Sequence, residues 1–148
     1  MKIAAVFTLF ISLTTAAACA HALDYVSVAE GPAILYDAPS TKSRKLFVVS
    51  RYWPLEQVVT LNDWVKVRDS SGTLAWIEKR ALSGMRFVTV TAAIAVVRQA
   101  PDEGAPVAFQ ARQQVALEWL ESTGSGWLKV RHQDGAIGFI SKTEVWGD

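Results

Sequence analysis

Short stretches of hydrophobic and polar residues alternate along the chain, with turn residues between them. Residues 58–61, 64–68 and 74–77 are rich in β-branched and aromatic side chains, and Asn62-Asp63 and Ser70-Ser71-Gly72 separate them. This spacing predicts short strands that are joined by tight turns. No window combines helical periodicity with capping residues, so we expect no substantial helix.

The same order of segments returns in the second half of the chain. Residues 115–120, 127–131 and 136–140 have the same strand character, and the turn residues between them are Gly124-Ser125-Gly126 and Asp134-Gly135. An Asp-Gly pair between alternating segments is a strong signal for a β-hairpin.

The two halves also match residue by residue, which indicates a tandem duplication. Leu-Tyr-Asp-Ala-Pro at residues 35–39 corresponds to Val-Arg-Gln-Ala-Pro at residues 97–101, an offset of 62. Trp-Val-Lys-Val-Arg at residues 64–68 corresponds to Trp-Leu-Lys-Val-Arg at residues 127–131, an offset of 63. One inserted loop residue accounts for the change of offset.

Each copy is small and is expected to fold as a barrel. A copy of about 62 residues lies near the lower limit for an independent hydrophobic core. Several short strands in so few residues favour a small barrel over an extended sheet, because closure removes exposed edges. The sequence therefore predicts an all-β protein with a first domain at residues 23–86 and a second at residues 87–148.

The first 22 residues have the three-part pattern of a secretory signal peptide. Lys2 supplies a positive start, residues 3–13 form an apolar run, and Ala20-His21-Ala22 places small residues at the two positions that a signal peptidase reads. The run is shorter than the roughly 20 residues that a membrane-spanning helix needs. We expect cleavage after Ala22, a periplasmic or secreted product and no integral membrane span.

Cys19 is the one cysteine of the chain and raises an alternative. A Cys at the end of an apolar run is the lipid acceptor in bacterial lipoproteins. Such sites usually carry Leu three positions upstream, where this chain has Ala16, so we favour simple cleavage over lipidation. The mature chain then contains no thiol for a disulfide, a nucleophile or a metal site.

Both copies resemble bacterial SH3 (SH3b) domains, over about residues 26–146. The resemblance rests on Gly-Trp-Leu-Lys-Val-Arg at residues 126–131, on the Gly-led hairpin at residues 135–141 and on the opening segment at residues 35–39. It implies two small SH3-like barrels in tandem. It also implies a role in binding cell-wall peptides, although small SH3-like barrels host many functions.

The Trp-led strand of each copy presents one Trp away from the core. Successive side chains of a strand face opposite sides, so Val65 and Val67 are expected in the core and Trp64 outside. Trp127 has the same place in the second copy. A fixed indole ring is a good binding platform, but each Trp is alternatively covered by the preceding loop or by the other domain.

By the same resemblance, three more aromatic residues of the first copy lie on the loop side and line a groove with Trp64: Tyr36, Tyr52 and Trp53. The second copy has Arg98 and a stretch without aromatics near residues 110–113 at the corresponding places. The first copy is therefore the better candidate for peptide or glycan binding. The alternative is that residues 52–54 only pack a loop.

Charge and residue types argue against several function classes. The chain has 15 Lys and Arg against 14 Asp and Glu, which does not give the basic excess of a nucleic-acid-binding protein. His132 is the one histidine of the expected mature chain and lies in a hairpin turn. Without a second His or a Cys, we predict no enzyme activity, no metal site and no cofactor.

Charge differs between the copies. Nine basic and seven acidic residues lie in residues 23–86, against five and seven in residues 87–148. These opposite net charges suit two barrels that face one another, or a basic barrel that approaches an anionic wall polymer, unless the charges are only solvated.

Together these features predict an exported, non-catalytic module that recognises cell-wall peptide or glycan through the aromatic groove of the first barrel. The alternative is an adaptor between envelope proteins, or a regulator that acts in trans on a wall hydrolase.

Overall fold

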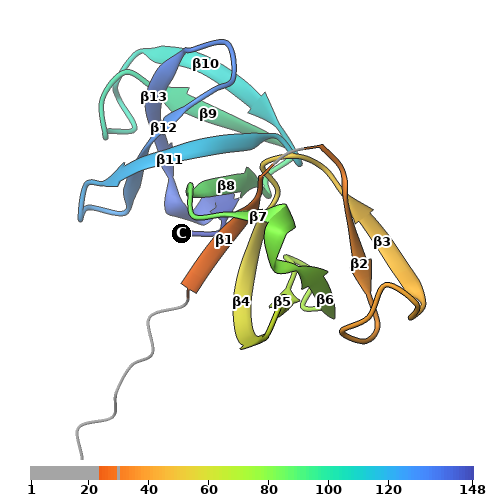
Figure 1. Cartoon of the computed structure of the whole chain (residues 1–148). Coiled ribbons are helices and arrows are strands. Elements are labelled where there is room, and N and C mark those ends of the chain that lie inside the picture. Colours follow the sequence, from red (N-terminus) through yellow and green to blue (C-terminus); the bar gives the residue numbers. More distant parts are fainter. Residues whose placement is uncertain (1–23, 30) are drawn as a thin grey trace, which may run out of the picture.

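The computed structural model describes residues 24–29 and 31–148, which form two antiparallel sheets of seven strands each, one after the other along the chain (Figure 1). The predicted all-β architecture is confirmed. The predicted signal peptide, residues 1–22 with Cys19, lies outside the described residues. Among the residues that are described, no helix is long and apolar enough to cross a membrane.

The first barrel contains the strands β1 (Asp24–Val28), β2 (Ala33–Tyr36), β3 (Lys45–Val49), β4 (Pro54–Leu61), β5 (Trp64–Arg68), β6 (Leu74–Glu78) and β7 (Leu82–Ser83), with the 3₁₀ turn η1 (Lys79–Ala81) between the last two. Hydrogen bonds join the strands in the order β3-β2-β6-β5-β4-β1-β7. Strand β4 pairs with β1 on one side and with β5 on the other, across a bulge between Gln57 and Val59. The bulge bends the strand, which helps the sheet to curl.

The second barrel contains β8 (Phe87–Val90), β9 (Ile94–Arg98), β10 (Val107–Arg112), β11 (Ala116–Ser122), β12 (Trp127–Arg131), β13 (Ile137–Ser141) and β14 (Val145–Trp146), with the 3₁₀ turn η2 (Lys142–Glu144) before the last strand. Its strand order, β10-β9-β13-β12-β11-β8-β14, matches that of the first barrel element for element.

Strand register confirms the duplication. Tyr36 on β2 lies opposite Trp76 on β6, and Arg98 on β9 lies opposite Phe139 on β13. The offset is therefore 62 on one strand and 63 on the other, as the sequence comparison gave. The additional residue falls in the turn between β11 and β12, which is longer than the Asn62-Asp63 turn between β4 and β5.

Each barrel has its own hydrophobic core, formed by side chains that alternate along the strands. Val65 and Val67 are buried in the first core, and Leu128 and Val130 in the second, as predicted. Burial of one such side chain contributes about 1.5–3 kcal/mol to folding. The alternate residues of these strands point outward and are half-buried or exposed, Trp64 and Trp127 among them.

A tight turn after the third strand is also duplicated. Tyr52 and Gln114 both have φ of 67°, and the backbone N–H of each donates to the first strand of its barrel, to the carbonyl of Val28 at 2.9 Å and of Val90 at 2.9 Å. Left-handed backbone is uncommon for residues other than Gly, so its recurrence identifies Gln114 as the structural counterpart of Tyr52.

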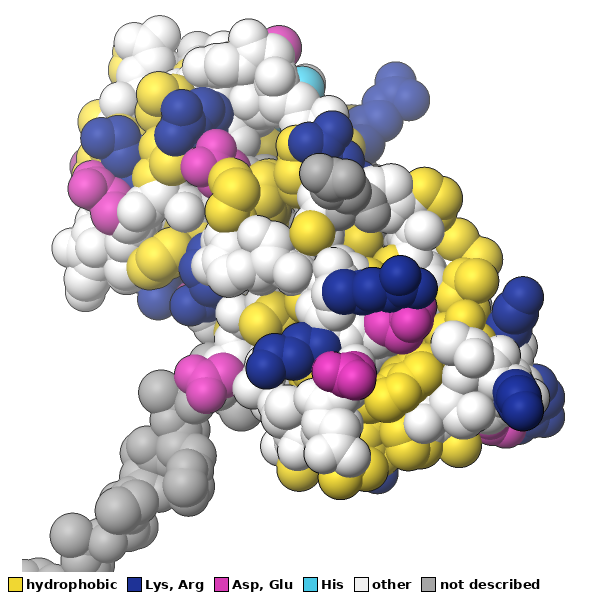
Figure 2. Space-filling model, viewed as in Figure 1, with side chains coloured by type: hydrophobic (Ala, Val, Ile, Leu, Met, Phe, Trp, Pro, Cys, Tyr) yellow, Lys and Arg dark blue, Asp and Glu magenta, His cyan; other side chains and the backbone are white. Residues whose placement is uncertain are grey.

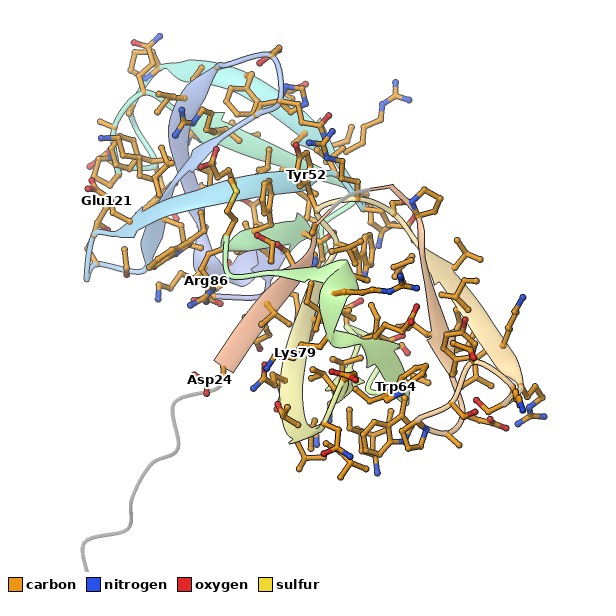
Figure 3. The ribbon with its side chains drawn as sticks, in the orientation of Figure 1. Asp24, Tyr52, Trp64, Lys79, Arg86 and Glu121 are labelled. Carbon is orange, nitrogen blue, oxygen red and sulfur yellow. The ribbon has the colours of Figure 1, made fainter. Side chains whose placement is uncertain are left out.

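Aromatic contacts join the two barrels. Tyr52 of the first barrel stacks on Phe87 of the second, with ring centroids 4.4 Å apart, and Tyr25 meets Trp146 edge-on at 5.2 Å. The guanidinium of Arg86, in the short linker, lies 5.5 Å from the Tyr25 ring and 4.9 Å from the Trp119 ring. Figure 3 shows Tyr52 and Arg86 on the side of the first barrel that faces the second.

Ion pairs do not join the barrels in the described part of the chain, where every ion pair lies within one barrel. Although the two copies have opposite net charges, the described residues form no ion pair across this interface. Stacked rings and cation–π contacts occupy it instead.

Candidate functional site

The outer face of the first barrel carries a cluster of aromatic side chains over the neighbouring strands β2, β6 and β5. The rings of Tyr36 and Trp64 meet edge-to-face, with centroids 5.4 Å apart and planes at 87°. The ammonium of Lys66 lies 5.9 Å from the Trp76 ring centroid. This arrangement follows from the strand register, because Tyr36 and Lys66 both lie opposite Trp76.

A cavity of about 480 Å³ lies next to this cluster, and we call it the Tyr36 pocket. Its lining residues belong to the loop before β2, to β2, to the end of β6 and to η1, and they include Ile34, Tyr36, Glu78, Arg80 and Ala81. The exposed fraction of Tyr36 is 5%, so its ring forms the floor of the cavity rather than a projecting platform.

Two charged groups stand at the rim of the Tyr36 pocket. Arg80 Nη2 lies 3.0 Å from Glu78 Oε1 and also donates a hydrogen bond of 3.1 Å to Glu78 Oε2. The Arg80 side chain is 81% exposed, so the pair is accessible and stabilises the fold by little, about 0–1 kcal/mol. A charged ligand can therefore replace either side chain of the Arg80–Glu78 pair with little loss of folding free energy.

The Tyr36 pocket offers three kinds of contact. Arg80 can donate hydrogen bonds to a carboxylate, Glu78 can pair with an amino group, and Ile34 and Tyr36 provide apolar surface. The rim supplies both charges, so the pocket favours a ligand that carries both.

Trp64 belongs to this site only indirectly. The residues that line the Tyr36 pocket do not include it, but its ring supports that of Tyr36, and its backbone lies opposite Glu78 on the neighbouring strand. Trp64 is therefore a positioning residue. Its ring is half-buried, between the two alternatives of an exposed platform and a covered side chain.

The second barrel has a cavity at the corresponding place, of about 370 Å³ and with different chemistry. Arg98 replaces Tyr36, and its Nη1 donates a 2.8 Å hydrogen bond to the carbonyl of Ala105. Trp127, the predicted platform of this copy, lines the cavity together with Glu144. Burial raises the pKa of the Glu144 carboxyl, and the nearby charge of Arg98 partly offsets this effect.

The prediction that Tyr52 and Trp53 line one groove with Tyr36 and Trp64 is wrong. Tyr52 stacks on Phe87 of the second barrel, and Figure 3 shows it well separated from Trp64. Trp53 packs against the first core. The cause is the tight turn at Tyr52, which directs both side chains away from the face that β2, β5 and β6 form.

His132 lies in the hairpin turn between β12 and β13, as predicted. Its Nδ1 is 3.0 Å from Asp134 Oδ1. The pKa of the Asp134 carboxyl is lowered by the hydrogen bond from the backbone N–H of Ala136 and by the contact with His132. Within the described residues no group of three or more His, Cys, Asp or Glu side chains is arranged to hold a metal ion.

Sequence reasoning missed Glu78 and Arg80 as site residues. Alternation along residues 74–78 places Glu78 on the same face as Trp76, so the position of its side chain was predictable. The location of Arg80 depends on the 3₁₀ turn η1, which begins at Lys79. The N-cap residue of this turn, Glu78, makes no side-chain capping hydrogen bond. No sequence signal marked that turn.

Fold and site together define a tandem pair of SH3-like barrels, each with a pocket beside the last turn of its sheet. The chain belongs to the bacterial SH3 domain family, whose model matches residues 29–84 and again residues 91–147. No curated protein is similar enough in sequence to match.

Three solved structures that are similar to the chain belong to larger proteins, and the chain spans about half of the length of each. NlpC1 from Trichomonas vaginalis shares 14% identity at a TM-score of 0.40, over 94% of this chain and 51% of that one. NlpC2 from the same organism shares 14% identity at a TM-score of 0.39, over 86% of this chain and 49% of that one. An NlpC/P60 family protein from Bacillus cereus ATCC 10987 shares 15% identity at a TM-score of 0.38, over 82% of this chain and 55% of that one.

Proposed function

We propose that this protein is an exported, non-catalytic binding module that recognises cell-wall peptide through the Tyr36 pocket of its first barrel. The observation that carries the proposal is the combination, in one pocket, of an aromatic floor with the exposed guanidinium of Arg80 and the half-buried carboxylate of Glu78. Peptides of bacterial cell walls carry free carboxylate and amino groups beside small aliphatic side chains, so they fit both parts. Export rests on the leader pattern of residues 1–22.

The difference between the copies supports the assignment to the first barrel. At the corresponding place the second barrel has a guanidinium, Arg98, that is held by a backbone carbonyl, and a partly buried carboxyl, Glu144. These groups are less free to exchange partners with a ligand. One barrel then binds, and the other serves to position it.

A second candidate function is that of an adaptor between envelope proteins, and an exposed strand edge favours it. Strand β3 lies at the end of the first sheet, and Phe47 and Val48 on it are 50% and 68% exposed. Figure 2 shows hydrophobic side chains on the side of the first barrel where Figure 1 places β3. Exposed strand edges with apolar side chains are common sites of protein contact.

Co-sedimentation of the purified protein with isolated cell-wall sacculi tests the first proposal. We expect the protein to pellet with the sacculi, and the variant Arg80→Ala to lose most of this binding. Arg44→Ala is a matched control, because the Arg44 side chain is also exposed, at 76%, and also pairs with a carboxylate, that of Asp37 at 3.3 Å.

The result that would overturn the proposal is a protein that stays in the supernatant, or one for which both Arg variants behave alike. If sacculi fail to bind while cross-linking in the envelope captures one reproducible protein through residues of β3, the adaptor function replaces it.

A further inference from the structure

A second cavity, separate from the Tyr36 pocket, lies between the two barrels, and we call it the inter-barrel cavity. Its volume is about 410 Å³. Arg51 and Tyr52 of the first barrel line it together with Met85 of the linker and with Phe87, Glu118, Arg131 and His132 of the second barrel. The Met85 side chain, 52% exposed, and the ring of Tyr52 supply its apolar part. Because residues of both barrels line the cavity, it exists only while the barrels are packed together.

A smaller cavity of about 230 Å³ lies between the same barrels and has a reciprocal construction. In the inter-barrel cavity, the Arg51-Tyr52 turn of the first barrel faces the hairpin turn at His132 in the second. In the smaller cavity, the Gln113-Gln114 turn of the second barrel accompanies Ser70, in the corresponding hairpin turn of the first. The duplication therefore gives two cavities with the same elements in exchanged roles.

The chemistry of the two cavities differs. The smaller cavity has the neutral amides Gln113 and Gln114 where the larger has Arg51 and Tyr52. Because the backbone turn is the same in both barrels, the turn itself does not require either side chain. Tyr52 contributes the stack on Phe87 that joins the barrels, whereas Arg51 adds a positive charge to the larger cavity.

Arg51 is the group of this cavity that is available to a ligand. Its guanidinium lies 4.3 Å from the Tyr52 ring centroid, and this contact restricts its position at the cavity that both residues line. In the described residues no ion pair joins Arg51 to a carboxylate, whereas Arg131 Nε is paired with Glu118 Oε2 at 3.1 Å. A ligand carboxylate would therefore bind Arg51 without displacing a partner.

We propose that the inter-barrel cavity binds the free carboxylate end of a short peptide. Arg51 holds the carboxylate through paired N–H donors, which match its geometry, and the last side chain of the peptide packs against Met85 and the edge of the Tyr52 ring. The cavity volume lies within the range of small-ligand sites, about 300–1,000 Å³. This site goes beyond the proposed function, which concerns the first barrel alone.

Two sources share this chemistry, namely a wall peptide that ends in D-residues and a protein C-terminus of L-residues. The test is an NMR titration of the full ¹⁵N-labelled protein with N-acetyl-D-alanyl-D-alanine, with N-acetyl-L-alanyl-L-alanine and with the carboxamide of each. We expect at least one acid to shift the backbone amides of Tyr52 and Gly135 saturably. We expect its carboxamide to bind about tenfold more weakly, because one charge-assisted contact is lost.

Variants identify the contact. Arg51→Gln, which installs the residue found at the matching position in the second barrel, should raise the dissociation constant about tenfold, and Arg51→Lys should raise it less. Gln113→Ala should have no effect. A preference for the D or the L acid identifies the source of the ligand, and either preference supports the site.

The proposal is overturned if neither acid shifts Tyr52 and Gly135 saturably at millimolar concentration, if acid and carboxamide bind alike, or if Arg51→Gln binds as the parent protein does. The amides of Ile34 and Glu78 report the Tyr36 pocket in the same spectra. Failure at the inter-barrel cavity is therefore distinguishable from failure of the proposed function.

Discussion

The ring of Tyr52 lies parallel to the ring of Phe87, with 4.4 Å between their centroids and 9° between their planes. This contact joins the turn before β4 to the first residue of β8. Such an aromatic pair contributes about 0.5–1.5 kcal/mol beyond the area that it buries. The placement of one barrel against the other thus depends on a few aromatic side chains.

Replacing Tyr52 should loosen the barrels without unfolding either. Tyr52→Gln is the suitable change, because Gln114 adopts the same φ of 67° at the matching place of the second barrel. Loss of the stack should let the barrels reorient independently, which shortens their rotational correlation times in ¹⁵N relaxation measurements. Gln114→Asn is the control and should leave these times unchanged; equal effects of the two changes would contradict the account.

Gly147 should tolerate no side chain. A Cβ at this position would lie 2.9 Å from Pro54 Cβ and 3.0 Å from the carbonyl oxygen of Phe87, and its φ is 111°. Gly147→Ala should therefore reduce the free energy of unfolding by about 1–3 kcal/mol, through crowding and backbone strain. Thermal unfolding measures it. Gly84→Ala, where nothing lies within 4 Å, is the control and should change the melting temperature little.

The ion pair that recurs in both barrels should differ in strength between them. Both carboxylate oxygens of Glu56 accept from Arg68 Nη1, at 3.0 and 3.1 Å, and the Glu56 side chain is 10% exposed. Glu118 makes the corresponding pair with Arg131 and is 27% exposed. Denaturant unfolding should show a loss of about 1.5–3 kcal/mol for Glu56→Gln and less for Glu118→Gln. The reverse order would be inconsistent with this burial.

The Tyr25 phenol should titrate late. Burial raises its pKa above the ordinary value of 10.0, and the charges of Glu56 and Asp148 add to the effect, while Arg86 and Arg68 oppose it. The folded state then holds this proton more tightly than the unfolded state does. The free energy of unfolding should therefore fall as the pH rises from about 10 through the raised pKa.

Tyrosinate absorbance at increasing pH measures this titration directly. Tyr25→Phe should remove an ionisation that occurs above the ordinary tyrosine pKa of 10.0. A variant that loses an earlier transition instead would show that the late group is not Tyr25.

Much of the fold was predictable because it depends on local patterns. The alternation at residues 64–68 and 127–131 and the constant offset between copies are visible in the sequence, and both recur in the strand register. In both strands the side-chain direction is set by the period of the strand. The position of Tyr36 was inferred from the family resemblance and not from this pattern.

The contacts between barrels were not predictable from these patterns. Tyr52 looked equivalent to Tyr36 as an aromatic residue near a loop, but its direction depends on a left-handed turn that its sequence does not signal. Nothing in the sequence pattern marks Phe87 or Trp146 as a residue of the contact between barrels. Their pairing with Tyr52 and Tyr25 joins residues that lie far apart along the chain, and no periodicity reports such contacts.

The most direct test of the proposed function is an NMR titration of the ¹⁵N-labelled protein with a purified disaccharide–peptide fragment of the cell wall. The account predicts saturable shifts at the backbone amides of Ile34, Tyr36 and Glu78, no shifts at their second-barrel counterparts Val96, Arg98 and Ser141, and about tenfold weaker binding by Arg80→Ala. Shifts confined to the second barrel, or no saturable shifts in the first, would contradict it.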